Sequence, residues 1–365
     1  MALGSISSLT APARRAFVCT LAGLAAALLP MALPAVNSVD FSVRDIRAAD
    51  WSASGINVRL ELGTAGRSQA RVLIRRARFA DPLGELQDID IRCPDPVVLA
   101  ALISCRGARI SASHQRFGRL RFVAAASFDR VRQSLAVNVR GLRLAGGNWR
   151  IDARWRASGW QLTALADRLP VAAVRKLAAP WISLPAGIEI EGTLSPRITV
   201  TGREHVQRMT ISAQVAALTL NNADGTLATD KLAMTIDAGL TPVARGYDIA
   251  SRLSLSGGQA YRDPVFLDLA RTPLSIAIVG AWQSAGQRFV VTRYTIDQPG
   301  VLLASGSAEF TPFGTTLVAA LSVSLERGVF PGFYATYLQP FLVNGDFKDL
   351  ATRGALRGSA EIIDG

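Results

Sequence analysis

The sequence is poor in the side chains that carry most enzyme chemistry. Its 365 residues include two histidines and three cysteines. His114 and His205 lie far apart in the chain, and no G-x-S-x-G elbow presents a nucleophile to either of them. Scattered carboxylates and two isolated histidines also lack the convergent ligands that a metal ion requires. The sequence therefore predicts a protein that is not an enzyme and that has no metal or cofactor.

Lysine is nearly absent, so the net charge of +12 comes almost entirely from arginine. The arginines alternate singly with apolar residues instead of forming clusters, and no helix-turn-helix or RNA-binding signature accompanies them. We therefore expect no nucleic-acid partner. We interpret the arginines as the solvated outer face of a sheet, with contact to anionic lipid head groups as the alternative.

Long hydrophobic runs are absent too, with one exception near the N-terminus. Arg14 and Arg15 precede an apolar run over residues 16–33, which is the order of an export signal. The length of the run lies between that of a long signal peptide and that of a minimal membrane span. We expect residues 1–37 to be a signal anchor or a cleaved signal peptide. The rest of the chain then lies in the periplasm, anchored in the inner membrane by residues 16–33.

What the sequence does contain, from Ser38 to its end, is an apolar residue at every second position. In Trp149–Arg156, for example, odd positions are apolar and even positions are charged. This alternation predicts strands with one apolar and one polar face. We expect strands over 39–47, 56–62, 70–79, 86–92, 107–113, 117–127, 134–144, 149–157, 188–200, 208–220, 227–237, 247–256, 265–282, 288–297, 301–310 and 316–326. Short turns between them favour antiparallel hairpins, so the predicted fold is all-β with a large apolar sheet face.

Proline-opened segments interrupt the strands and predict three short helices, over 94–102, 170–181 and 331–341. The second and third are followed by a glycine-centred strand, and their prolines recur at a spacing of about 160 residues, which predicts a repeated unit. We divide the body into a first strand segment over 38–169, a second over 170–329, and the start of a further repeat over 330–365.

Aromatic residues recur at helical spacings around the third helix: Phe330, Phe333, Tyr334, Tyr337 and Phe341. They form either ordinary core or the apolar side of a helix that lies at a membrane surface or caps a groove.

Two cysteines flank the first predicted helix, which therefore forms a helical loop within the first strand segment. The spacing of Cys93 and Cys105 fits neither a redox motif nor a zinc site. In an oxidising compartment the pair forms a disulfide, and the alternative is two buried free thiols.

Together these features resemble the AsmA-like superfamily of bacterial envelope proteins, and most of all its YdbH group. The matching features are the N-terminal anchor, the run of antiparallel strands, the punctuating helices, and the segment from Cys93-Pro94-Asp95-Pro96 to Cys105-Arg106-Gly107. The resemblance covers residues 38–365, although YdbH proteins are usually longer. It implies an elongated, curved antiparallel sheet that forms an open apolar groove, and a role in moving phospholipid between the inner and outer membranes.

We therefore expect a groove that binds phospholipid without catalysis. Its predicted lining consists of apolar residues in alternating strands: Ile56, Val58, Leu60, Leu120, Phe122, Leu135, Val137, Trp149, Ile151 and Trp155. One alternative is a structural scaffold for outer-membrane biogenesis or secretion that binds an envelope protein and does not conduct lipid. Another is an exported enzyme on a β-sandwich or β-helix, which would need a polar cleft.

Overall fold

The computed structural model describes residues 38–47, 51–62, 68–79, 84–178, 187–285, 287–311, 318–342 and 354–363. The predicted N-terminal anchor lies outside these residues. Within the described ranges, no helix combines the length and the apolar character needed to cross a membrane.

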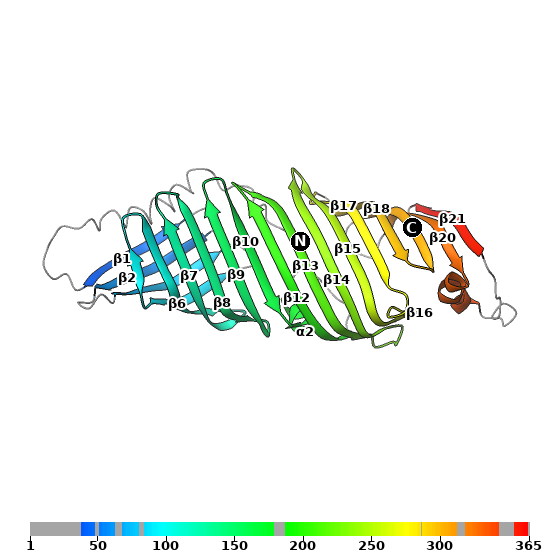
Figure 1. Ribbon diagram of the computed structural model, residues 1–365, viewed down its shortest axis with the longest axis horizontal. Coiled ribbons are helices and arrows are strands. Elements are labelled where there is room, and N and C mark those ends of the chain that lie inside the picture. The colour runs from blue at the N-terminus through cyan, green and yellow to red at the C-terminus, as the bar shows by residue number, and fades with distance from the viewer. Residues whose placement is uncertain are drawn as a thin grey trace. The chain divides into compact units, whose positions relative to one another are not determined.

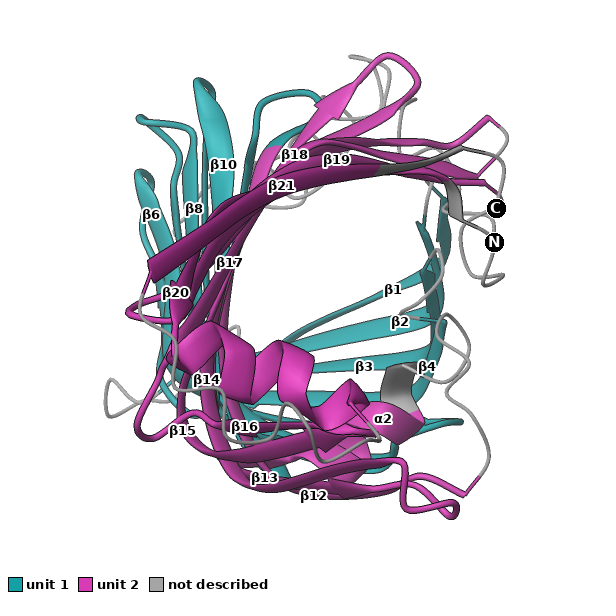
Figure 2. Cartoon of the chain, turned by 90° about the vertical axis from the view of Figure 1, so that its right-hand side faces the viewer, with its two compact units in different colours: residues 1–166, 199–207 teal, residues 167–198, 208–365 magenta. Residues whose placement is uncertain are grey.

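The prediction of an all-β chain is confirmed. Strands account for 78% of the structure and helices for 6%, and the strands form one large antiparallel sheet that is open rather than closed (Figure 1). The chain divides into two compact units, unit 1 with residues 1–166 and 199–207, and unit 2 with residues 167–198 and 208–365 (Figure 2).

The strands that begin in unit 1 alternate direction along the chain. They are β1 (Ser38–Arg47), β2 (Trp51–Leu62), β3 (Ser68–Phe79), β4 (Glu85–Cys93), β5 (Pro96–Val98), β6 (Leu102–His114), β7 (Gly118–Asp129), β8 (Ser134–Leu144), β9 (Gly147–Arg156) and β10 (Gly159–Asp167). Each long strand pairs with the next long strand, and the short β5 pairs with β6. The turn between β8 and β9 has two residues, Ala145 and Gly146, and both have the positive φ that a tight hairpin requires.

The remaining elements continue the same meander and add the helices; β13 begins in the last residues of unit 1, and the others begin in unit 2. They are β11 (Leu169–Pro170), α2 (Val171–Ala178), β12 (Glu189–Gly202), β13 (Val206–Asn221), β14 (Leu227–Val243), β15 (Gly246–Arg262), β16 (Val265–Asp268), β17 (Leu274–Gln283), β18 (Arg288–Gln298), β19 (Leu302–Phe310), β20 (Val318–Phe330), η1 (Tyr334–Leu338), η2 (Gln339–Phe341) and β21 (Gly354–Ile363). The short β11 and β16 pair with β12 and β15.

Two local predictions are wrong. The helical loop predicted over 94–102 contains strand β5, in which β-branched Val97 and Val98 pair with β6 instead of coiling. The strand predicted over 265–282 is two strands, β16 and β17, separated by a turn that contains Pro273. In both cases a neighbouring strand decides the local structure.

The helix predicted after Pro170 is present as α2, within the described residues. The segment after Pro331 is helical, and it includes the π-helical turn η1 followed by the 3₁₀ turn η2.

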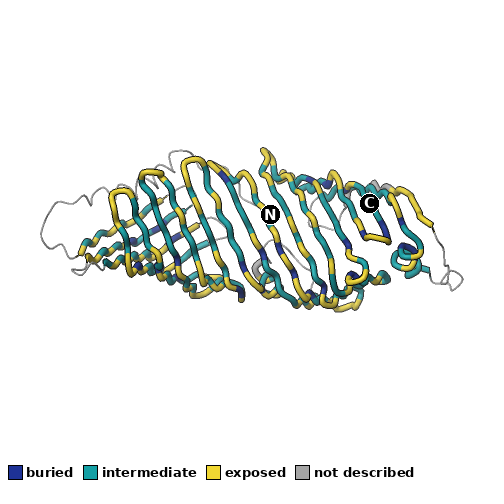
Figure 3. Tube along the Cα trace, viewed as in Figure 1, coloured by how far each residue is buried: buried dark blue, intermediate teal, exposed yellow. Residues whose placement is uncertain are grey.

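The core is thin. Exposed and half-buried residues alternate along most strands (Figure 3), and within the described part of the chain only Leu269 and Gln298 have less than 2% of their side-chain surface exposed. Three buried clusters exist. The first, around Ile56 and Ile89, consists only of strand residues of unit 1, whereas the other two belong to unit 2 and include helical residues.

Candidate functional site

The strand register of unit 1 forms a continuous row of apolar side chains across five strands, β2, β3, β4, β6 and β7. Val58 lies opposite Val72, Val72 opposite Ile91, and Ile91 opposite Ile110. Ile110 in turn lies opposite Phe122. Side chains directly opposite each other in an antiparallel pair point to the same side of the sheet. Val58 on β2 and Phe122 on β7 therefore share one face.

A second row extends this apolar face to β9. Phe128 lies opposite Leu135, and Leu135 lies opposite Trp155. Phe128 follows Phe122 by an even number of residues on the same strand, so the two rows occupy the same face. The remaining predicted lining residues lie at two-residue steps on these strands: Ile56, Leu60, Leu120, Val137, Trp149 and Ile151. The structure thus brings all ten predicted residues onto one face.

This apolar face is only half-covered. Ile56 is buried, with 8% of its surface exposed, and the other nine residues are half-buried. The packing partners of the cluster around Ile56 all come from neighbouring strands, and the described residues of unit 1 include no helix. Most domains bury the apolar face of a sheet beneath a second layer. No such layer is present among the described residues of unit 1.

Unit 2 covers part of its own apolar face with helices. Val171 of α2 packs against the cluster around Leu218 and Leu269. Phe333 and Tyr334 are buried, and Phe333 packs with Val301 of the neighbouring cluster.

The five aromatic residues of the third predicted helix divide between sheet and solvent. Phe333 contacts the rings of both Phe330 and Tyr337, at centroid distances of 6.3 and 5.8 Å. Phe341, in contrast, is 59% exposed. The helix therefore lies against the sheet through Phe333, Tyr334 and Tyr337 and leaves Phe341 at the surface.

One buried polar group anchors this helix, and the sequence pattern did not identify it. The Gln298 side chain is almost fully buried; its Nε2 donates to the carbonyl and the hydroxyl of Thr272, each at 3.1 Å. The Tyr337 hydroxyl donates to Gln298 Oε1 at 2.7 Å. Burial raises the pKa of Tyr337 to about 12, so the hydroxyl stays protonated and can donate to a higher pH than an ordinary tyrosine would.

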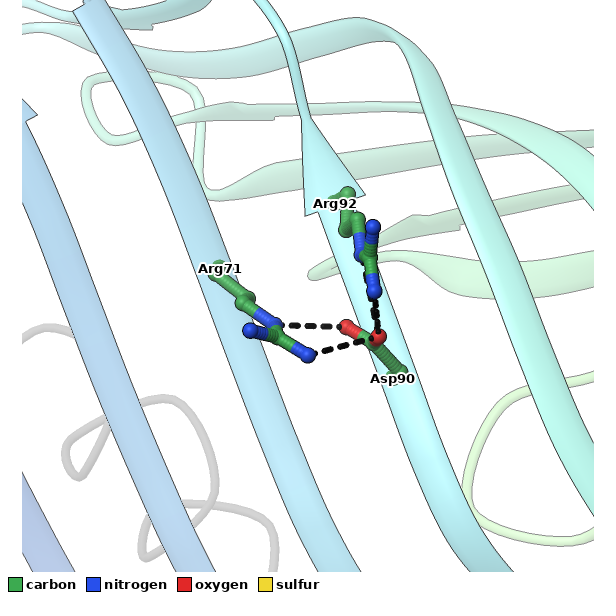
Figure 4. Close-up of polar contacts among 3 residues, drawn as sticks. All are labelled: Arg71, Asp90 and Arg92. Carbon is green, nitrogen blue, oxygen red and sulfur yellow. Dashed lines mark hydrogen bonds and ion pairs between the residues drawn. The ribbon is translucent and has the colours of Figure 1, made fainter.

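The opposite face of unit 1 is charged. Asp90 on β4 accepts hydrogen bonds from Arg71 on β3 and from Arg92 on its own strand (Figure 4). The Arg71 and Arg92 guanidinium groups lower the pKa of Asp90 from 3.8 to about 2. The sequence alone does not show that two arginines share Asp90, or that one of them, Arg71, lies on another strand, because both facts depend on the strand register.

The lowered pKa of Asp90 predicts a loss of stability in acid. A depressed folded-state pKa contributes stability that is present above pH 4 and is lost as the pH falls towards 2. Because the arginines are half-exposed, we expect a contribution of about 1–2 kcal/mol. Asp90→Asn should remove that contribution and flatten the urea-unfolding free energy between pH 5 and 2. Asp248→Asn is the control, and an Asp90→Asn profile identical to that of the unsubstituted chain would contradict the assignment.

A disulfide joins Cys93 and Cys105, with an S–S distance of 2.07 Å. It connects the end of β4 to β6 across the short β5. Of the two alternatives that the sequence left open, the structure therefore contains the disulfide and not the free thiols.

The described residues include a shallow surface depression but no candidate metal cluster. They contain no group of three or more histidine, cysteine or acidic residues that could hold a metal ion. A shallow depression along β19–β21 is lined by Leu303, Ser324, Leu325, Glu326, Arg327, Arg357, Gly358 and Ser359.

Comparisons of the chain with protein-family models, with curated proteins and with solved structures find no match.

Proposed function

We propose that the chain binds the acyl tails of phospholipid along the apolar face of unit 1, and that it takes part in phospholipid transport between the inner and outer membranes without catalysis. The observation that carries this proposal is an apolar face, continuous from β2 to β9, with no covering layer among the described residues. A face of this kind is stabilised by an apolar occupant.

The energetics support a lipid tail as that occupant. Each methylene transferred from water to an apolar surface contributes about 0.8 kcal/mol, so a tail of about fourteen methylenes contributes about 11 kcal/mol. Because the apolar row has no charged interruption between Val58 and Phe122, a tail could move along it without crossing a polar barrier.

The distribution of burial supports a groove. In β3 the apolar-face residues Val72 and Ile74 are half-buried, whereas Arg71 on the other face is exposed. Side chains on a concave face converge and shade one another, while those on a convex face splay apart. Figure 2 shows β1–β4 of unit 1 along one side of a bent sheet and β6, β8 and β10 along another. We place the apolar face on the inner side of this bend.

The periplasm is the compartment that fits this proposal. The disulfide between Cys93 and Cys105 favours an oxidising environment. Residues 16–33 would then anchor the chain in the inner membrane, and the chain would be a member of the AsmA-like superfamily of YdbH type.

Site-specific photo-crosslinking in living cells tests the proposal. A benzoylphenylalanine at position 155, on the apolar face, is expected to form an adduct with phospholipid that mass spectrometry identifies. The same probe at position 154 is the matched control, because Arg154 is exposed on the opposite face of the same strand. Equal lipid adducts at both positions, or none at 155, would reject the groove.

A scaffold that does not conduct lipid is the second candidate. Strand β21 pairs with β20 alone among the described strands, and its residues 354–360 are all exposed. An open strand edge can bind another protein by adding a strand. Protein adducts at position 359, together with an absence of lipid adducts at 155, would favour this candidate.

A further inference from the structure

A row of arginines crosses four neighbouring strands on the charged face of unit 1. Arg59 on β2 lies opposite Arg71 on β3, and Arg71 lies opposite Arg92 on β4. Arg92 lies opposite Arg109 on β6. Directly opposite side chains have Cβ atoms about 5 Å apart, and like charges in such positions repel each other. The row therefore opposes folding unless anions neutralise it.

Carboxylates of the chain neutralise only part of this row. Asp40 forms an ion pair with Arg59 at 2.7 Å. Asp90 forms ion pairs with Arg71 at 3.0 Å and with Arg92 at 2.7 Å, so one negative charge is shared between two positive charges (Figure 4). Arg109 has no ion-pair partner among the described residues.

Two more arginines enlarge the charged area on β7. Arg121 lies opposite Ser111, and Arg119 lies opposite Ser113, on the same face as Arg109. Both are exposed, and within the described part of the chain neither forms an ion pair. We call the six residues Arg59, Arg71, Arg92, Arg109, Arg119 and Arg121 the arginine patch. Its uncompensated charge is concentrated on Arg109, Arg119 and Arg121.

Exposed apolar residues lie within this charged area. Val123 lies opposite both Arg109 and Arg140 and is 46% exposed. Leu73, opposite Asp90, is also an exposed large hydrophobic residue. Aliphatic side chains among cations match the boundary between lipid head groups and acyl tails. The residues at these register positions include no aromatic side chain, whereas single-stranded nucleic acid requires aromatic stacking platforms.

We propose that the arginine patch docks unit 1 against the anionic head groups of a phospholipid membrane. Guanidinium groups bind phosphate oxygens in bidentate geometry, and an anionic surface relieves the repulsion within the row. This docking uses the face opposite to the apolar one. It therefore does not depend on lipid binding by the apolar face, and the two can fail separately.

Vesicle capture tests the docking. The full chain is held in phosphatidylcholine nanodiscs and mixed with sucrose-loaded vesicles. One set of vesicles contains phosphatidylcholine alone, and in the other set about one lipid in three is the anionic phosphatidylglycerol. Capture of anionic vesicles at low salt, lost at high salt, is the expected result. Each arginine near an anionic surface contributes about fivefold in affinity, so R109Q/R119Q/R121Q should lose about 100-fold.

The matched control removes the same charge elsewhere. Arg245, Arg252 and Arg293 of unit 2 are exposed, and R245Q/R252Q/R293Q should keep capture within about twofold. An equal loss in both triple variants would overturn the patch, because net charge alone would then explain binding. Equal capture of neutral vesicles would overturn it too. Capture of a single-stranded RNA oligonucleotide by the chain, in place of anionic vesicles, would overturn the proposal as well.

Two further variants separate charge from folding. R109K/R119K/R121K retains the charge and should retain most of the capture, and a loss equal to that of the glutamine variant would overturn the proposal. Asp90→Asn releases two arginines and should strengthen capture about fivefold. Circular dichroism verifies that each variant folds. Lipid adducts at position 155, measured in the same variants, should not change.

Discussion

Val137→Asp is expected to strip phospholipid from the chain. Val137 lies on the apolar face of β8, opposite Ala126 and Ala153, so small neighbours leave room for the new side chain. An ionised carboxylate beside an acyl tail loses hydration without gaining a partner, which costs several kcal/mol. We expect the phospholipid recovered per chain, measured by mass spectrometry after detergent-free purification, to fall by about tenfold or more.

The neighbouring residue supplies the control for this experiment. Ala136 is exposed on the opposite face of the same strand and lies opposite Arg154. Ala136→Asp introduces the same charge next to a cation, so both fold and bound lipid should be unchanged. A folded Val137→Asp chain that retains its lipid would refute the proposed function. That result would not bear on the arginine patch, which vesicle capture tests separately.

Removal of the disulfide is expected to give the largest loss of stability. The Cys93–Cys105 bond closes a loop with a sequence separation of 12, and a loop of this size restricts the unfolded chain by about 3 kcal/mol. C93S/C105S should therefore lower the free energy of unfolding in urea by about that amount. The unsubstituted chain in dithiothreitol should show the same loss.

Ser104→Ala, next to Cys105, is the control, and it should change stability by less than about 0.5 kcal/mol. The oxidation state in cells provides an independent measurement. Maleimide-polyethylene glycol should label Cys93 and Cys105 only after reduction. Labelling of both thiols without reduction would contradict the disulfide and, with it, the argument for an oxidising compartment.

The alternation of apolar and polar residues predicted most of the long strands, although it missed β10. The pattern over 56–62 is the second half of β2, and the pattern over 149–157 is nearly all of β9. The residue pattern of each strand indicates which side chains share a face, because successive side chains on an extended backbone point to opposite sides. Short glycine-containing turns indicated that consecutive strands run antiparallel.

The same local pattern failed where a neighbouring strand competed with it. Residues 94–102 have a helix-like opening with Pro94, yet Val97 and Val98 pair with β6. A helix and a short strand can both bury these valines, and only the position of β6 decides between them. Gln298 is a similar case, since a lone polar residue at the end of a strand gives no sign of its burial beneath Tyr337.

By itself, the sequence determined an all-β chain with two-faced strands, a set of apolar residues for one face, and arginines for the other. Each of these depends on covalent geometry within a few residues. Only the tertiary structure decided the register that aligns Val58 with Phe122 across five strands and places Arg59, Arg71 and Arg92 in one row. It also decided that, among the described residues, helices cover part of the apolar face of unit 2 and none covers that of unit 1. Pairing depends on bulges and on contacts between distant segments, which no local pattern encodes.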